Sequence, residues 1–139
     1  MSDSDLDSAD PTALDNALRT VLSSAAPLDA EHTRVAVRAL TTAAEYLTVA
    51  LGPAASVSMP TTGDVAQLLV GLHIAVHRLH AGLHQLSAGI ARRQVAADAP
   101  IVEIAGMQAA LGIAVDRLGT AALGLGAAGE ALKTPVAQH

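Results

Sequence analysis

Apolar residues recur every three or four positions along most of the chain, which is the period of an amphipathic α-helix. The pattern is most regular from about Thr62 onward. There the apolar positions follow alternating steps of four and three: Val65, Leu69, Leu72, Val76, Leu79, Leu83, Leu86 and Ile90. Such a seam, sustained for more than three heptads, predicts a long helix that packs against another helix. The two-residue alternation of a β-strand is absent from the sequence, so the chain is predicted to be all-α.

A second seam follows Pro100 and runs to about Lys133. Its members are Ile104, Gln108, Leu111, Val115, Leu118, Ala122, Leu125, Gly129 and Leu132. Beside this seam a row of small residues recurs every seven positions: Ala105, Gly112, Gly119 and Gly126. Glycine is about 1 kcal/mol less favourable than alanine inside a helix, so this row predicts close approach of a neighbouring helix.

Capping residues and prolines predict where the other helices begin and end. Asp10 offers a cap oxygen, and Pro11 is already fixed at a helical φ, so a short helix is expected from there to a point before Pro27. Asp29 predicts the start of a longer helix. That helix should run to Leu51, where a Gly-Pro pair stops it.

These elements predict an antiparallel, up-and-down helical bundle of three long helices and one short N-terminal helix, with Ala/Gly-rich heptad packing. Residues 53–60 are expected to form a loop. A very short connection at residues 97–100 should make the two heptad helices antiparallel neighbours. Residues 1–9 are expected to be a disordered acidic tail, and residues 10–134 a single domain.

The composition narrows the function classes. The chain is 51% hydrophobic but only 1% aromatic, contains no cysteine and has a formal net charge of -5. Because it lacks aromatic stacking platforms and excess positive charge, nucleic-acid binding is not expected. Zero cysteines exclude disulfides, thiolate nucleophiles and zinc-thiolate sites. The preference for Arg over Lys and the abundance of Ala are typical of a bacterial protein from a GC-rich genome.

The N-terminus is acidic and polar, which is the opposite of a secretory signal, so a cytoplasmic location is expected. The mean hydropathy is high, but charged residues interrupt every long apolar run. The uninterrupted stretches at residues 104–115 and 118–129 are shorter than the ~20 residues that span a bilayer. No membrane span is therefore predicted.

The most prominent chemical feature is a row of four histidines, His73, His77, His80 and His84, at spacings of four, three and four. On a helix this spacing places the four imidazoles along one stripe, and pairs at i and i+4 are within chelating reach. Imidazole suits zinc, copper and nickel. The row therefore predicts candidate ligands for one of these ions.

Two further residues extend the candidate metal set. Counted along the expected helices at about 1.5 Å per residue, His32 and Asp116 fall at the height of His80. The candidate set is thus His77, His80 and His84, with His73, His32 and Asp116 in reserve.

Two other interpretations of the row stay open. In an antiparallel pair of helices, His73 and His80 would fill the notches left by Gly112, Gly119 and Gly126, which is ordinary packing of large against small. Alternatively, neighbouring imidazoles titrate near neutral pH and would make the packing over them sensitive to pH. The Glu-x-x-His and His-Glu-x-x-His spacings of stronger metal sites are missing from the sequence.

Two functions remain. The first is a non-catalytic interaction or assembly module, because the two heptad helices are apolar on more than one face and would need a second copy or a protein partner to cover them. The second is a small histidine-based metal-binding protein for storage, buffering or sensing. Catalysis is not expected, because no nucleophile and base stand at an interpretable spacing.

Overall fold

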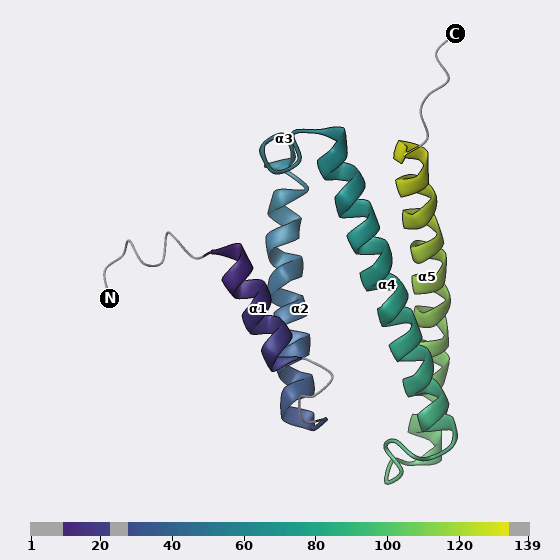
Figure 1. The fold of residues 1–139 in the computed structure, drawn as a ribbon. Coiled ribbons are helices and arrows are strands. Elements are labelled where there is room, and N and C mark those ends of the chain that lie inside the picture. The colour runs from purple at the N-terminus through teal and green to yellow at the C-terminus, as the bar shows by residue number, and fades with distance from the viewer. Residues whose placement is uncertain (1–9, 23–27, 134–139) are drawn as a thin grey trace, which may run out of the picture. The chain divides into compact units, whose positions relative to one another are not determined.

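The computed structural model describes residues 10–22 and 28–133, and the regular structure in these ranges is entirely helical. The predicted acidic tail at residues 1–9 lies outside the described residues. The prediction of an all-α chain is confirmed. Figure 1 shows the helices, which are α1 (Pro11–Val21), α2 (Ala30–Ala50), α3 (Ala55–Ser58), α4 (Thr62–Ala91) and α5 (Ile101–Lys133).

The predicted capping residues Asp10 and Asp29 begin α1 and α2, and a capping box begins α4. A side-chain oxygen of Asp10 accepts a hydrogen bond from the backbone N–H of Thr12 at 3.0 Å. Asp29 accepts from the backbone N–H of His32 at 2.7 Å. At α4, Thr61 and Asp64 each accept from the other's backbone N–H, which completes a capping box. These bonds satisfy N–H groups that have no partner within the helix.

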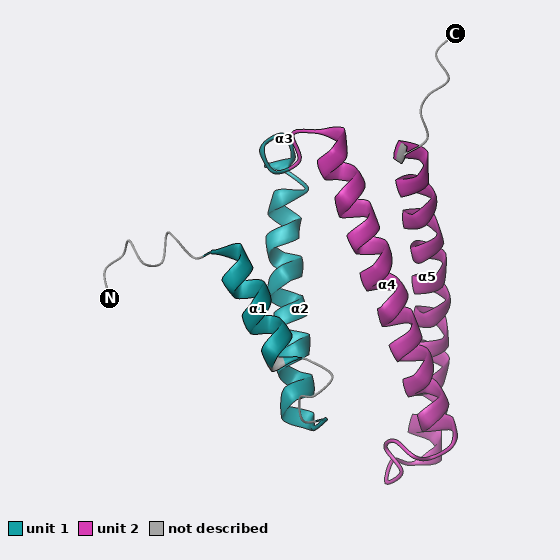
Figure 2. Ribbon diagram, viewed as in Figure 1, with its two compact units in different colours: residues 1–58 teal, residues 59–139 magenta. Residues whose placement is uncertain are grey.

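The chain divides into two compact units, residues 1–58 and 59–139 (Figure 2). In the first unit α2 contacts α3, a single turn inside the segment that was expected to be a loop, so the predicted helix count is one too low. The turn forms because the N–H groups of Val57 and Ser58 both donate to the Ala54 carbonyl. The Ser58 hydroxyl also donates to the Ala50 carbonyl. A single domain over residues 10–134, packed as one bundle, stays a prediction.

In the second unit α4 and α5 lie side by side as a helical hairpin (Figure 1). Its direction is antiparallel, because His80 lies against Gly119 while the earlier His73 lies against the later Gly126. The buried residues of α5 all belong to the predicted seam: Ile104, Val115, Ala122 and Gly129. From α4, Ile90 is buried in this core at the end next to the connecting loop.

Helix α4 ends at Ala91, so the connection to α5 is the nine residues 92–100 and not the shorter segment 97–100 predicted from the sequence. Arg93 has a φ of 55° and adopts the left-handed conformation. Its N–H donates to the Ile90 carbonyl, and the next N–H donates to the Gly89 carbonyl. These two bonds form a Schellman motif, which ends the helix even though the left-handed residue is not glycine.

Within the described residues, no helix is both long and apolar enough to cross a membrane.

Candidate functional site

All four predicted histidines lie on α4, and they differ in exposure. His73 and His80 are half-buried against α5, whereas His77 and His84 are exposed. The row therefore consists of two inner rings that contact the neighbouring helix and two outer rings that face solvent.

The ring of His73 rests directly on the backbone of α5. A Cβ built on Gly126 would lie 3.1 Å from Cε1 and 3.2 Å from Nδ1 of His73, which is tighter than ordinary van der Waals contact. The same ring bonds the Ala122 carbonyl oxygen through Nδ1 at 2.7 Å. Because a carbonyl only accepts, Nδ1 must carry the hydrogen, and Nε2 of the neutral ring keeps its lone pair. Gly126 therefore lets His73 approach closely enough to make this bond.

His80 also packs against a glycine of α5, one heptad further along α4. Its Nε2 would lie 3.2 Å from a Cβ built on Gly119. The structure thus confirms that His73 and His80 pack into two of the three predicted glycine notches. The prediction that a histidine fills the notch at Gly112 is wrong, because no atom lies within 4 Å of a Cβ built on this residue. In this register the residue opposite Gly112 is Ser87, whose side chain is too short to reach it.

The four rings also form two stacked pairs along α4. The ring centroids of His73 and His77 are 6.2 Å apart with an interplanar angle of 21°. Those of His80 and His84 are 6.5 Å apart with an angle of 17°. Each pair joins one inner ring to one outer ring, so the histidine row is built from two similar halves.

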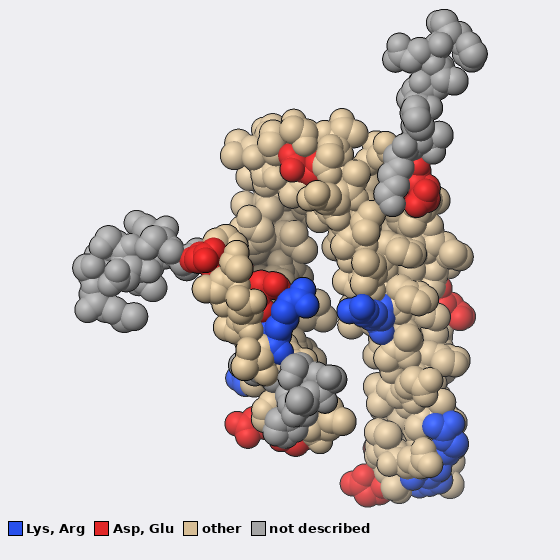
Figure 3. Space-filling view, in the orientation of Figure 1, with Lys and Arg blue, Asp and Glu red and all other residues tan. Residues whose placement is uncertain are grey.

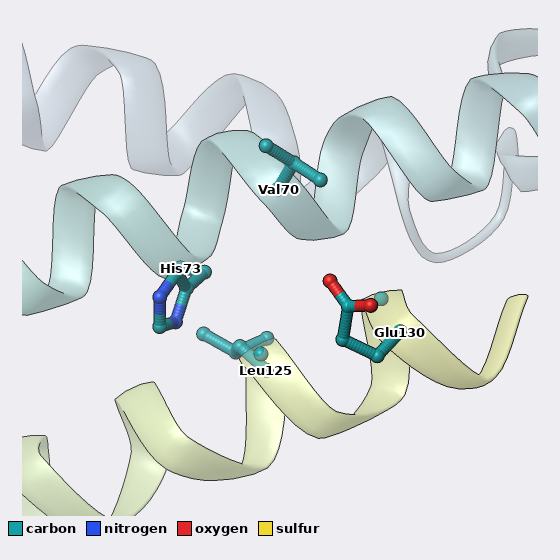
Figure 4. A pocket seen from close by; sticks show the side chains of 6 residues that line it. Val70, His73, Leu125 and Glu130 are labelled. Carbon is teal, nitrogen blue, oxygen red and sulfur yellow. The ribbon is translucent and has the colours of Figure 1, made fainter. Parts of the chain in front are cut away.

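A shallow depression borders the first pair. Val70 and His73 of α4 line one side of it, while Leu125 and Glu130 of α5 line the other together with two glycines (Figure 4). The depression is largely apolar, and the His73 ring and the Glu130 carboxylate are its ionisable groups. This carboxylate was not among the residues singled out from the sequence.

Two of the three reserve residues, His32 and Asp116, do not lie on α4 with the row. His32 belongs to α2 in the first unit, whereas Asp116 lies on α5, exposed, within one turn of Gly119. Among the residues that the structure describes, no group of three or more His, Asp or Glu side chains is arranged to hold a metal ion. Coordination of zinc, copper or nickel by the full set therefore stays a prediction.

His32 has a local partner of its own. Its Nδ1 lies 2.9 Å from the Asp29 carboxylate, whose oxygen also accepts the His32 backbone N–H. These bonds, the backbone one first, lower the pKa of Asp29 below its ordinary value. The sequence signals this pair, because Asp29 is a predicted cap and His32 follows it by three residues. The side chain of the third residue of a helix can reach back to the cap.

Comparisons of this chain with protein-family models, with curated proteins and with solved structures gave no match.

Proposed function

We propose that the chain is a non-catalytic assembly module that associates with a second copy of itself through one apolar stripe of α4. The observation that carries the proposal is the uncovered apolar surface of the hairpin. Ten large apolar residues of α4 and α5 are exposed, whereas the large ones buried in its core are Ile90, Ile104 and Val115. The exposed ones are Val70, Ile74, Leu79, Leu86, Ile101, Val102, Met107, Ile113, Leu123 and Leu132.

Such a surface favours a binding role because a helix that is apolar on several sides is normally covered on several sides. Figure 3 shows the face of the second unit in view as largely uncharged, with few charged groups. Few charges would have to be desolvated on association there.

The stripe that we assign to self-association consists of Ala75, Leu79, Gly82 and Leu86, at spacings of four, three and four; we call it the Leu79 stripe. All four residues are exposed, Leu79 at 39% and Leu86 at 38%. No atom lies within 4 Å of a Cβ built on Gly82, so the surface beside Leu79 is open. The leucines of the stripe form knobs, and Ala75 and Gly82 leave holes between them. A second helix can pack against such an alternation of large and small residues.

The order of large and small residues points to a second copy. If two α4 helices pair antiparallel about a twofold axis midway between Leu79 and Gly82, Leu79 of one copy meets Gly82 of the other. In the same register Leu86 meets Ala75. Each leucine then faces a small residue in both directions, as a self-complementary twofold interface requires.

The expected affinity is modest. Complete burial of a leucine contributes about 1.5–3 kcal/mol to the free energy of association. The two copies together bring four leucines, Leu79 and Leu86 of each, and covering their exposed two-fifths contributes roughly 4 kcal/mol. A dissociation constant of about 1 μM needs roughly 8 kcal/mol beyond the entropy lost on association. Neighbouring apolar surface of α4 and α5 must therefore join the interface, and measurements should extend to high micromolar concentration.

The test introduces a leucine at Gly82. G82L fills the hole that Leu79 of the second copy would occupy, while open space around Gly82 lets the hairpin keep its fold. The matched control is G106L, since Gly106 is equally open and exposed but lies on α5, outside the stripe. Multi-angle light scattering across concentrations should show dimers for the natural chain and for G106L, and monomers for G82L.

The swapped variant L79A/G82L exchanges the knob and the hole, so it should dimerise again. A natural chain that stays monomeric at every concentration would overturn the proposal. So would a G82L variant of unchanged mass. If G82L lowers the stability of a monomer instead, another part of the same chain covers the stripe, and the proposed partner is wrong.

A further inference from the structure

We infer that α4 carries two separate two-histidine sites for a divalent transition-metal ion, His73–His77 and His80–His84. This inference is independent of the proposed assembly. It rests on the division of the row into two stacked pairs, each of which joins a half-buried ring to an exposed one. One i, i+4 pair supplies two ligands, and water completes the coordination of the ion.

The inner and outer rings have different parts in each site. Two rings that chelate one ion must converge, because metal–nitrogen distances are about 2.0–2.1 Å. Stacked at centroid distances of 6.2 Å and 6.5 Å, the rings have to turn toward one another. The exposed rings of His77 and His84 are free to turn, while the inner rings are held against α5. In each pair the inner ring therefore supplies a fixed ligand, and the outer ring turns to complete the chelate.

His73 is oriented as a metal ligand would be. Histidines that bind metal usually donate their other ring N–H to a carbonyl or carboxylate, which fixes the tautomer. The bond from Nδ1 of His73 to the Ala122 carbonyl does this and leaves the lone pair on Nε2. Glu130 lines the same depression, and its carboxylate favours a cation there (Figure 4). We therefore expect His73–His77 to be the tighter site.

Charged residues of both helices bear on the two sites. Arg78 of α4 lies between the two pairs in the sequence, and its positive charge opposes cation binding on this helix. On α5, Glu130 lines the depression beside His73, and its carboxylate offsets that charge there. The pair centres are seven residues apart, about 10 Å along the helix. This separation exceeds the screening length of about 8 Å at physiological salt, so both sites can fill together.

The ligand chemistry defines the ion. Neutral imidazole nitrogens without thiolates suit Cu²⁺, Ni²⁺ and Zn²⁺, and Cu²⁺ binds most tightly in this series. Cu²⁺ is therefore the probe of choice, because its electron paramagnetic resonance spectrum also reports the number of bound nitrogens.

The experiment titrates the full chain with Cu²⁺ near pH 7.5, followed by calorimetry and electron paramagnetic resonance. We expect two equivalents per chain with two imidazole nitrogens on each ion. H77A and H84A should each lose one equivalent, and the double variant should lose both. E130Q should weaken the tighter site several-fold and leave the other unchanged. H32A is the control, because His32 lies outside the row, and it should bind two equivalents.

Both exposed histidines tolerate alanine, which is the best helix former, and circular dichroism verifies that the variants remain helical. Copper binding that persists in the double variant would overturn the inference. Coordination by a single nitrogen per ion would also overturn it. So would complete loss of copper binding in H77A alone or in H84A alone, since that result would mean one shared site in place of two.

Discussion

Replacing Gly126 with alanine should destabilise the α4–α5 hairpin, although the same change at Gly112 should stabilise it. Alanine gains about 1 kcal/mol over glycine inside a helix at either position. At Gly112 the new methyl group meets no atom within 4 Å, so this gain is realised. At Gly126 the methyl group would lie 3.1 Å from His73, whose ring must move.

Movement of that ring is costly because it is bonded to the Ala122 carbonyl at 2.7 Å. Loss of the bond costs about 1 kcal/mol. A strained rotamer adds about 1 kcal/mol more. G126A should therefore come out roughly 1 kcal/mol less stable than the natural chain, and about 2 kcal/mol less stable than G112A.

Native-state hydrogen exchange of the α5 amides is the suitable assay, because it reports the stability of the hairpin separately from the first unit. Protein concentration is held constant, since association adds apparent stability. A double-mutant cycle assigns the cause: in a H73A background, G126A should become stabilising. Equal effects of G126A and G112A, or a penalty for G126A that persists without His73, would refute the reasoning.

Two further predictions concern the loop after α4 and the start of α2. Ala96 has a φ of 51°, so A96G should stabilise the chain by about 0.5–1 kcal/mol, as measured by urea unfolding. R93G should gain less stability, because the Arg93 guanidinium donates to the Ala97 carbonyl and glycine loses that bond. Equal gains for the two variants would contradict this reasoning. Hydrogen bonds from His32 lower the pKa of Asp29, so the stability that this carboxylate gives α2 is full above about pH 4 and is lost as the pH falls through the lowered value. D29N keeps a good cap without a charge and should remove that acid step from the helical circular dichroism signal, whereas an unchanged step would exclude Asp29 as its source.

Two helix starts were predictable because their signals are local. Asp10 and Asp29 cap helices within three residues of themselves, so neighbouring sequence suffices to place them. The end of α4 was not predictable in the same way. Its left-handed residues are Arg93 and Ala96, neither of which is a glycine that would mark the turn.

The contacts of the histidine row were predictable only in part. The seven-residue repeat on each helix predicts that His73 and His80 meet glycines of α5, but it does not determine which two of the three glycines they meet. The bond to the Ala122 carbonyl depends on the ring rotamer, which spacing does not determine. Grouping His32 with the row required the two units to be placed relative to one another, and local patterns carry no such information.

The most direct test of self-association through the Leu79 stripe is a distance measurement between two copies. The chain has no cysteine, so Q67C and Q85C each introduce one spin label at an exposed site of α4. In an antiparallel pair centred between Leu79 and Gly82, labels at position 67 of the two copies lie 27 residues apart along the helix, about 40 Å. Labels at position 85 lie nine residues apart, about 14 Å. Double electron–electron resonance should therefore give a long distance for Q67C and a much shorter one for Q85C. Equal distances at the two positions, or no dipolar signal from either variant, would contradict the proposed pairing.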